Sequence, residues 1–142
     1  MKTKGVIFIA TGSQYRSEAA SSLEYSRPFL HSFSTSIYTD DPDDPNISSF
    51  DSIFQHPCPS FSYRDKISPL LDLPYDYNLF LDSDSFLVHN PTELFDLLHH
   101  FDFLAAQARC LFRAGLERSC AQGKLGRYEC SCSLCYRYGQ GG

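Results

Sequence analysis

The 142-residue sequence has no long apolar run. No segment reaches the roughly 18 to 20 consecutive apolar residues that a membrane-spanning helix needs. The apolar stretch nearest the start, GVIFIA at residues 5–10, also falls short of the roughly 7 to 15 apolar residues of a signal-peptide core. We therefore expect no membrane span and no targeting signal, and we predict a cytoplasmic protein.

Basic residues are scarce in the first three quarters of the chain. Residues 1–108 contain 6 Lys and Arg against 15 Asp and Glu, a net charge of −9, whereas residues 109–142 contain 6 against 2, a net charge of +4. An acidic body disfavours nonspecific binding of nucleic acid and suits a site that holds a divalent cation. We expect no nucleic-acid partner.

Cysteine is also nearly absent from residues 1–108, where Cys58 stands alone. The other five lie in the remaining 34 residues: Cys110, Cys120, Cys130, Cys132 and Cys135. This change in composition predicts a boundary near Ala108. We interpret residues 109–142 as a Cys-, Arg- and Gly-rich tail that is disordered or foreign to the fold, as a truncated or frame-disrupted gene would produce. An alternative is a zinc site that uses the C-x-C-x₂-C spacing with Cys110 or Cys120.

The apolar pattern of residues 1–108 alternates between strand-like and helix-like periods. Short apolar runs predict strands at residues 5–10, 35–39, 53–54, 77–81 and 101–106, with an edge strand at 86–88. Helical spacing predicts helices at residues 14–30, 61–71 and 91–99. Pro28 is expected to kink or end the first, Pro69 interrupts the second, and Asn90 is the N-cap of the third. The run DDPDDPN at residues 40–46 is typical of a solvated turn. Alternating strands and helices indicate an α/β fold with a mostly parallel sheet.

Two acidic residues follow one of the predicted buried strands directly. Asp82 and Asp84 come after YNLFL at residues 77–81, so their carboxylates are expected at the carboxyl end of the sheet, where open α/β sheets bind ligands. If the strand-like conformation continued, residues two apart would point to the same side and could reach one hard cation such as Mn²⁺ or Mg²⁺. The same pair also suits an ordinary solvated turn.

The order of these segments resembles the GT-A fold of glycosyltransferases, in particular glycogenin-like members, over residues 5–106. VIFIATGSQYRSEA at residues 6–19 resembles their first strand and nucleotide-binding turn. YRDKI at 63–67, followed by LPYDYNLFLDSDSFLVHNPTELFDLL at 73–98, resembles their basic residue, DxD strand and following helix. The resemblance implies a Rossmann-like three-layer fold that is truncated at the C-terminus, with residues 1–108 as the donor-binding half.

The resemblance also assigns roles to individual residues. It implies that Asp82 and Asp84 coordinate Mn²⁺ or Mg²⁺, and that a nucleoside diphosphate sugar is the donor for an unknown acceptor. The implied nucleotide-sugar contacts are Thr11, Gly12, Arg16, Lys66, Asp82 and Ser83, with Arg64 as a second choice. For the two cations the alternative is a structural ion pair, such as Arg16 with Glu18 or Lys66 with Asp65. No acceptor-site pattern follows residue 108, so we expect an incomplete transferase.

Two other functions remain open at this stage. LFLDSDS also resembles the motif of haloacid-dehalogenase-like phosphatases, in which Asp82 would be the nucleophile and Asp84 the acid/base. In that family the motif usually ends the first strand of the core, whereas here at least two strand-helix units precede it. The second alternative is a noncatalytic binding module whose Cys-rich tail binds a metal or a partner.

Overall fold

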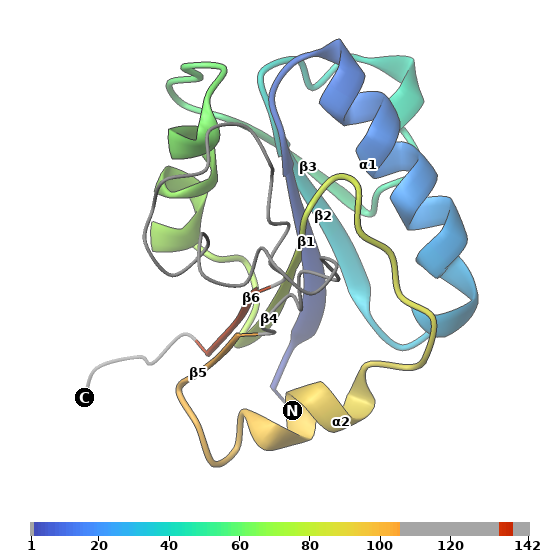
Figure 1. Ribbon diagram of the computed structural model, residues 1–142, viewed down its shortest axis with the longest axis vertical. Coiled ribbons are helices and arrows are strands. Elements are labelled where there is room, and N and C mark those ends of the chain that lie inside the picture. Colours follow the sequence, from blue (N-terminus) through green and yellow to red (C-terminus); the bar gives the residue numbers. More distant parts are fainter. Residues whose placement is uncertain (1, 106–133, 138–142) are drawn as a thin grey trace, which may run out of the picture.

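The computed structural model describes residues 2–105 and 134–137. They form one six-stranded sheet with helices and 3-10 turns around it (Figure 1). The strands are β1 (Lys4–Ala10), β2 (Ser34–Thr39), β3 (Ser52–Gln55), β4 (Tyr77–Leu81), β5 (Phe103–Ala105) and β6 (Leu134–Arg137). The α-helices are α1 (Ser13–Ser26) and α2 (Thr92–Leu97), and the 3-10 helices are η1 (Arg27–Phe29), η2 (Pro45–Ile47), η3 (Tyr63–Lys66) and η4 (Ser68–Leu71).

The strand order is β3-β2-β1-β4-β6-β5. β3, β2, β1 and β4 are parallel to one another, which confirms the predicted α/β fold with a mostly parallel sheet. β6 is antiparallel to both β4 and β5. From β1 the chain runs outward to β2 and β3 and then returns to the other side of β1 as β4. The direction of strand addition therefore reverses at β1, which makes the β1–β4 boundary a topological switch point.

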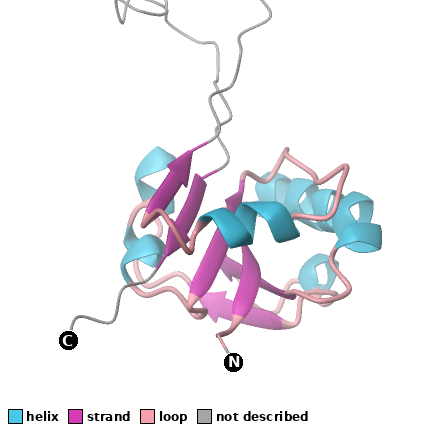
Figure 2. Ribbon diagram, turned by 90° about the horizontal axis from the view of Figure 1, so that it is seen from below, coloured by secondary structure: helices cyan, strands magenta, loops and turns pink. Residues whose placement is uncertain are grey.

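The sheet is covered on both faces, because side chains along a strand alternate between its two sides. Val6 and Phe8 of β1 belong to the buried cluster that includes Leu23 of α1. Ile7 and Ile9 belong to a second cluster, against which Leu70 of η4 packs. Figure 2 shows helical segments on both sides of the sheet. α1 lies on one face together with η2, whose Ile47 belongs to the same cluster as Leu23, and η4 lies on the other face. This burial explains why GVIFIA is apolar throughout rather than alternating.

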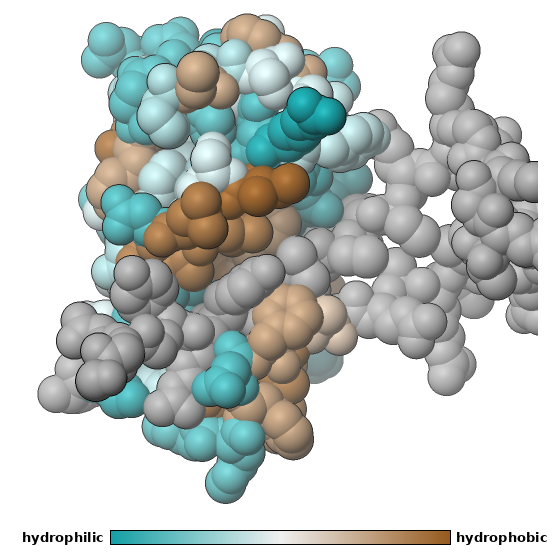
Figure 3. Space-filling view, turned by 90° about the vertical axis from the view of Figure 1, so that its left-hand side faces the viewer, coloured by the Kyte–Doolittle hydropathy of each residue, from teal (hydrophilic) through white to brown (hydrophobic). Residues whose placement is uncertain are grey.

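The predicted helix at residues 61–71 is wrong, since this segment forms the two short 3-10 helices η3 and η4. Pro69 is the physical reason, because it has no N–H to donate and disfavours the α-helical conformation of the residue before it. The short turns leave Ile67 and Leu71 62% and 76% exposed. Figure 3 shows apolar surface gathered on this face of the molecule.

The segments around the other two helices also differ from expectation. α1 ends at Ser26 and Pro28 lies in the 3-10 turn η1, so the predicted helix ends near Pro28, as expected, rather than at Leu30. Residues 86–88 are not the predicted edge strand but a loop, in which the Leu87 N–H donates to Ser26 Oγ at 2.9 Å. α2 is shorter than the predicted 91–99, and it covers the amino end of the sheet, where Phe95 stacks on Phe33 with ring centroids 4.9 Å apart.

The tail also contributes to the sheet. Residues 134–137 form β6 between β4 and β5, so the expectation of a tail without strands is wrong for these four residues. The remainder of the predicted tail lies outside the described residues, and so do its proposed zinc ligands except Cys135, which is part of β6. None of the helices in the described part of the chain is long and apolar enough to cross a membrane.

Candidate nucleotide site

A pocket of about 480 Å³ lies at the carboxyl ends of β1 and β4, between α1 and η3. This is the switch point of the sheet, and the volume falls within the roughly 300 to 1,000 Å³ of small-molecule sites. Its lining is Ile9, Thr11, Gln14, Tyr15, Glu18, Phe61, Ser62, Tyr63, Asp65, Lys66, Asp82, Ser83 and Asp84. Thr11, Lys66, Asp82, Ser83 and Asp84 were predicted from the sequence. Gly12, Arg16 and Arg64 are outside this lining.

The two aspartates of the DSD motif lie in a turn rather than in an extended strand. β4 ends at Leu81, and the Ser85 N–H donates to the Asp82 carbonyl at 3.0 Å. Asp82 is buried and Asp84 is exposed. The expected strand-like conformation at this motif is therefore wrong, although both aspartates line the same pocket. Asp and Ser side chains compete for local hydrogen bonds, which favours a turn directly after the apolar strand.

Two buried serines of α1 hold this turn in place. Ser22 Oγ donates to the Ser83 carbonyl at 2.7 Å, and Ser26 Oγ accepts from the Leu87 N–H. On the pocket side, Ser83 Oγ donates to Glu18 at 3.3 Å. The turn that carries the acidic motif is thus fixed to the helix that follows β1.

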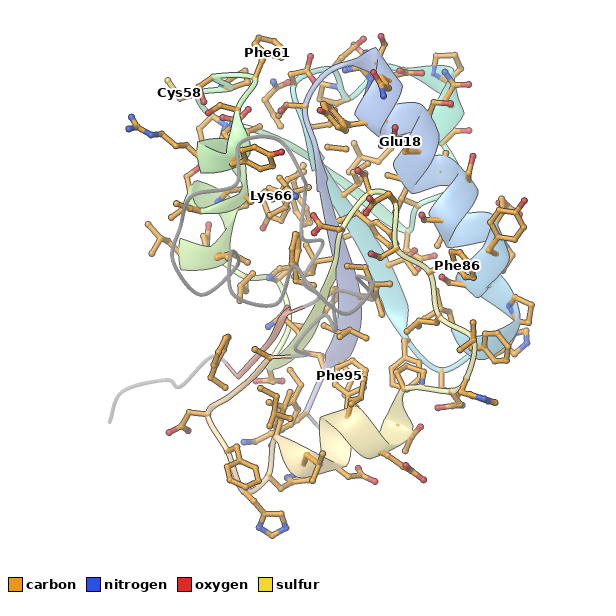
Figure 4. All side chains as sticks on the ribbon, viewed as in Figure 1. Glu18, Cys58, Phe61, Lys66, Phe86 and Phe95 are labelled. Atoms are coloured by element: carbon orange, nitrogen blue, oxygen red, sulfur yellow. The ribbon has the colours of Figure 1, made fainter. Side chains whose placement is uncertain are left out.

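Lys66 and Asp82 are in direct contact across the pocket. The Lys66 ammonium donates to Asp82 Oδ1 and also lies 5.6 Å from the centroid of the Tyr63 ring. The expected alternative partner, Asp65, turns away to other groups. Figure 4 shows Lys66 on the 3-10 segment across the sheet from Glu18 of α1. A positive charge therefore lies beside one carboxylate of the DSD motif.

Asp65 is a buried carboxylate that joins three parts of the pocket. It accepts hydrogen bonds from Thr11 Oγ1 at 2.7 Å, from the Ser60 N–H and the Phe61 N–H at 2.8 Å each, and from Ser60 Oγ. Burial alone would raise the pKa of Asp65, but the hydrogen bonds from Ser60, Thr11 and Phe61 outweigh it and hold the pKa well below its usual range. Asp65 is therefore an anion with its acceptors occupied, and it fixes the end of β1 to the loop before η3.

Arg16 lies on the β2 side of β1, where carboxylates surround it. Its guanidinium donates to Asp40 at 2.7 Å and to Asp44 at 2.5 Å, and Asp41 is 3.5 Å away. Burial lowers the pKa of Arg16, but the hydrogen bonds to Asp44 and Asp40 outweigh it and raise the pKa. The Gly12 N–H also donates to Asp40, at 2.7 Å. The acidic run is thus not only a solvated turn, because two of its carboxylates form ion pairs with the buried Arg16.

The sequence interpretation missed the aromatic part of the lining, as well as Ile9, Gln14, Glu18, Ser62 and Asp65. Tyr15, Phe61 and Tyr63 line the pocket and are 48%, 66% and 66% exposed. Phe61 has a backbone φ of 53°, the only positive φ of a non-glycine residue among those described. No periodic pattern marks these positions, because Phe61 lies in a loop and Tyr15 matched an apolar helix position.

The charges of the lining suit a cation more than a free anion. Glu18, Asp65, Asp82 and Asp84 face one cation, Lys66, so the formal charge of the lining is −3. Within residues 2–105 and 134–137, no three His, Cys, Asp or Glu side chains are placed to hold a metal together. Mg²⁺ bound through one or two carboxylates and the phosphates of a substrate does not need such a group. The DSD carboxylates fit this second mode.

A scan against models of protein families and a search of curated proteins found no match to this sequence. The fold defines an α/β protein with a pocket at its topological switch point.

Proposed function

We infer that the pocket binds a nucleoside diphosphate sugar together with Mg²⁺ or Mn²⁺, as expected for the donor half of a GT-A glycosyltransferase. The observation that carries this inference is the meeting of the β1 end and the DSD turn at the switch point, with Thr11, Lys66 and Asp82 in one pocket. Open α/β sheets bind nucleotides at this position.

The charge of the pocket requires the ligand to bring a cation. A diphosphate placed beside Asp82 and Asp84 is repelled by both carboxylates, and Lys66 compensates only one of them. A divalent cation shared between these carboxylates and the diphosphate removes this repulsion, and when bound it would also stabilise charge on the departing nucleoside diphosphate. Lys66 can add a charge-assisted hydrogen bond to a phosphate oxygen once it leaves Asp82.

Two residues that the resemblance assigned to ligand contact have other partners. The guanidinium of Arg16 donates to Asp40 and Asp44, and the Gly12 N–H donates to Asp40. We therefore limit the proposed direct contacts to Thr11, Lys66 and the DSD turn. Arg16 and Gly12 would instead fix the carboxyl end of β1 to Asp40 on the β2 side.

Titration calorimetry with nucleoside diphosphates and their sugars, with and without Mg²⁺ or Mn²⁺, tests the proposal. The expected result is binding that requires the cation and is lost in Asp84→Asn. The matched control is Asp96→Asn, since Asp96 is an exposed aspartate on α2, where it pairs with Lys4 away from the pocket. Binding that is equal in Asp84→Asn and wild type, or no binding in either protein, contradicts the proposal.

The same protein preparations test the phosphatase alternative. If the chain hydrolyses a generic phosphomonoester and Asp82→Asn abolishes the hydrolysis, Asp82 is a nucleophile and the transferase proposal fails.

A further inference from the structure

The aromatic side of the pocket has features that neither the fold nor the DSD motif requires. Phe61 is two-thirds exposed, although its aromatic ring could bury a large apolar area. Its backbone is in the left-handed region, which is costly for a residue with a Cβ atom. A strained backbone that holds an apolar ring in solvent contributes nothing to the core, and such strain occurs mainly at functional sites.

The strain is maintained by the buried carboxylate of Asp65. Asp65 accepts the N–H of Phe61 and the N–H of Ser60, and its remaining bond to Thr11 ties it to the end of β1. The loop that carries Phe61 is therefore fixed to the same strand end that carries the polar half of the pocket. Figure 4 shows Phe61 at the tip of this loop, on the side of the molecule where α1 begins.

The rings of Phe61 and Tyr15 lie close to the same point. A Cβ atom placed on Gly12 would be 3.9 Å from Phe61 Cδ1 and 3.9 Å from Tyr15 Cδ2. The two ring carbons are thus separated by no more than twice that distance, so both rings border the same part of the pocket. Gly12 adds no side chain between them.

We propose that Phe61, held by Asp65, is the stacking wall for the nucleobase of the bound nucleotide, and that Asp65 is the positioning residue for this wall. The proposal rests on the proposed function for the identity of the ligand. A nucleoside has the matching chemistry, because its flat aromatic base suits the ring wall while its ribose and phosphates suit the polar lining that contains Lys66 and the DSD turn.

The absence of tryptophan from the whole sequence allows a direct test. Phe61→Trp introduces one tryptophan at the wall, and Phe101→Trp introduces one at an exposed position after α2, at the opposite end of the sheet. Uridine, guanosine and adenosine are titrated into both variants without metal, together with ribose 5-phosphate and free glucose. The Phe101→Trp variant corrects for light absorbed by the bases.

The expected result is quenching of the Phe61→Trp fluorescence by at least one nucleoside, with no quenching by ribose 5-phosphate or glucose. The affinity for that base's nucleoside diphosphate should fall about tenfold in Phe61→Ala, which is the loss expected for one stacking interaction. Asp65→Asn should reduce the quenching of the Phe61→Trp tryptophan in a protein whose circular dichroism is unchanged. Ser60→Ala removes only one side-chain bond to Asp65 and should have a smaller effect.

Other outcomes separate the two proposals. Metal-dependent nucleotide binding that is unchanged in Phe61→Ala, with no quenching in Phe61→Trp, overturns the stacking wall and leaves the proposed function in place. Quenching by nucleosides without any metal-dependent binding of diphosphates supports the wall and contradicts the proposed function. Quenching by glucose but not by nucleosides assigns the wall to a sugar and overturns the nucleobase proposal. Equal quenching in Asp65→Asn and in its parent overturns the role of Asp65.

Discussion

At the carboxyl edge of the sheet, the β2 side of β1 differs from its β4 side. On the β2 side, a buried arginine fills the crevice and binds Asp40 and Asp44. On the β4 side, the crevice is an open pocket in which Lys66 contacts the single carboxylate of Asp82. Both sides contain the cation and carboxylates that a phosphate-metal site needs. Only the β4 side leaves them accessible to a ligand.

The chain connections explain this difference. α1 joins β1 directly to β2, so its first turns lie over the β2 side and bring Arg16 to the acidic loop that follows β2. β4 is reached from β3 through η3 and η4 on the other face (Figure 1). The space between α1 and η3 therefore has no covalent connection across it. Charge on the β2 side is therefore used within the fold, whereas charge on the β4 side lines an open pocket.

Arg16→Ala should have the largest effect on stability. It leaves two largely buried carboxylates without their partner, for which we expect a loss of about 3 kcal/mol in the free energy of unfolding. The measurement is urea denaturation followed by circular dichroism. Arg27→Ala is the control, because its pair with Glu24 is exposed and should change stability by less than about 1 kcal/mol. Equal losses in the two variants would contradict the distinction between the two sides of β1.

Asp65→Asn should have the next largest effect, and its size should depend on pH. The pKa of Asp65 is lower in the folded protein than in the unfolded chain, so its contribution is complete above the unfolded pKa of about 3.9 and decreases as the pH falls below it. We expect Asp65→Asn to cost about 2 kcal/mol near neutral pH and less in acid. Urea denaturation between neutral pH and pH 3 measures this. A difference from wild type that stays constant over this range would contradict the assignment.

Lys66→Met should affect binding more than stability. Removing the ammonium frees one oxygen of Asp82, so the affinity for Mg²⁺ alone should rise, whereas the affinity for the metal-nucleotide complex should fall about tenfold with the loss of one charged hydrogen bond. Calorimetry measures both affinities. Lys4→Met is the control, since Lys4 pairs with Asp96 at the amino end of the sheet. A change of both affinities in the same direction would contradict the expectation that the Lys66 ammonium competes with Mg²⁺ for Asp82 and binds the nucleotide phosphate.

Phe61→Gly should have the smallest effect, and its direction is informative. Glycine tolerates a φ of 53° without strain, so we expect the free energy of unfolding to rise by about 0.5 kcal/mol even though an aromatic ring is lost. Phe101→Gly, at a position with ordinary backbone geometry, should lower it. Urea denaturation compares the two variants. A loss of stability in Phe61→Gly as large as that in Phe101→Gly would show that Phe61 serves packing rather than binding.

The apolar runs predicted the strands because burial on both faces leaves a composition that sequence alone can reveal. YNLFL matches β4 at every residue, and GVIFIA falls within β1. The segment at 61–71 failed because its apolar spacing is helical while Pro69 prevents a continuous helix. The acidic run at 40–46 was interpreted as solvated because its arginine partner is 24 or more residues earlier in the chain. No local pattern identifies such a pair.

The sequence by itself determined the parallel sheet and the position of Asp82 at the end of a buried strand. These follow from local composition and from the rule that parallel strands end at a common edge. The nearness of Thr11 and Lys66 to Asp82 was implied only by the resemblance to GT-A glycosyltransferases. Only the tertiary structure decided that Lys66 is available in a pocket and Arg16 is not, and that Asp65 fixes Phe61 at the pocket wall. Each of these depends on contacts between distant or irregular segments, which have no repeating period along the chain.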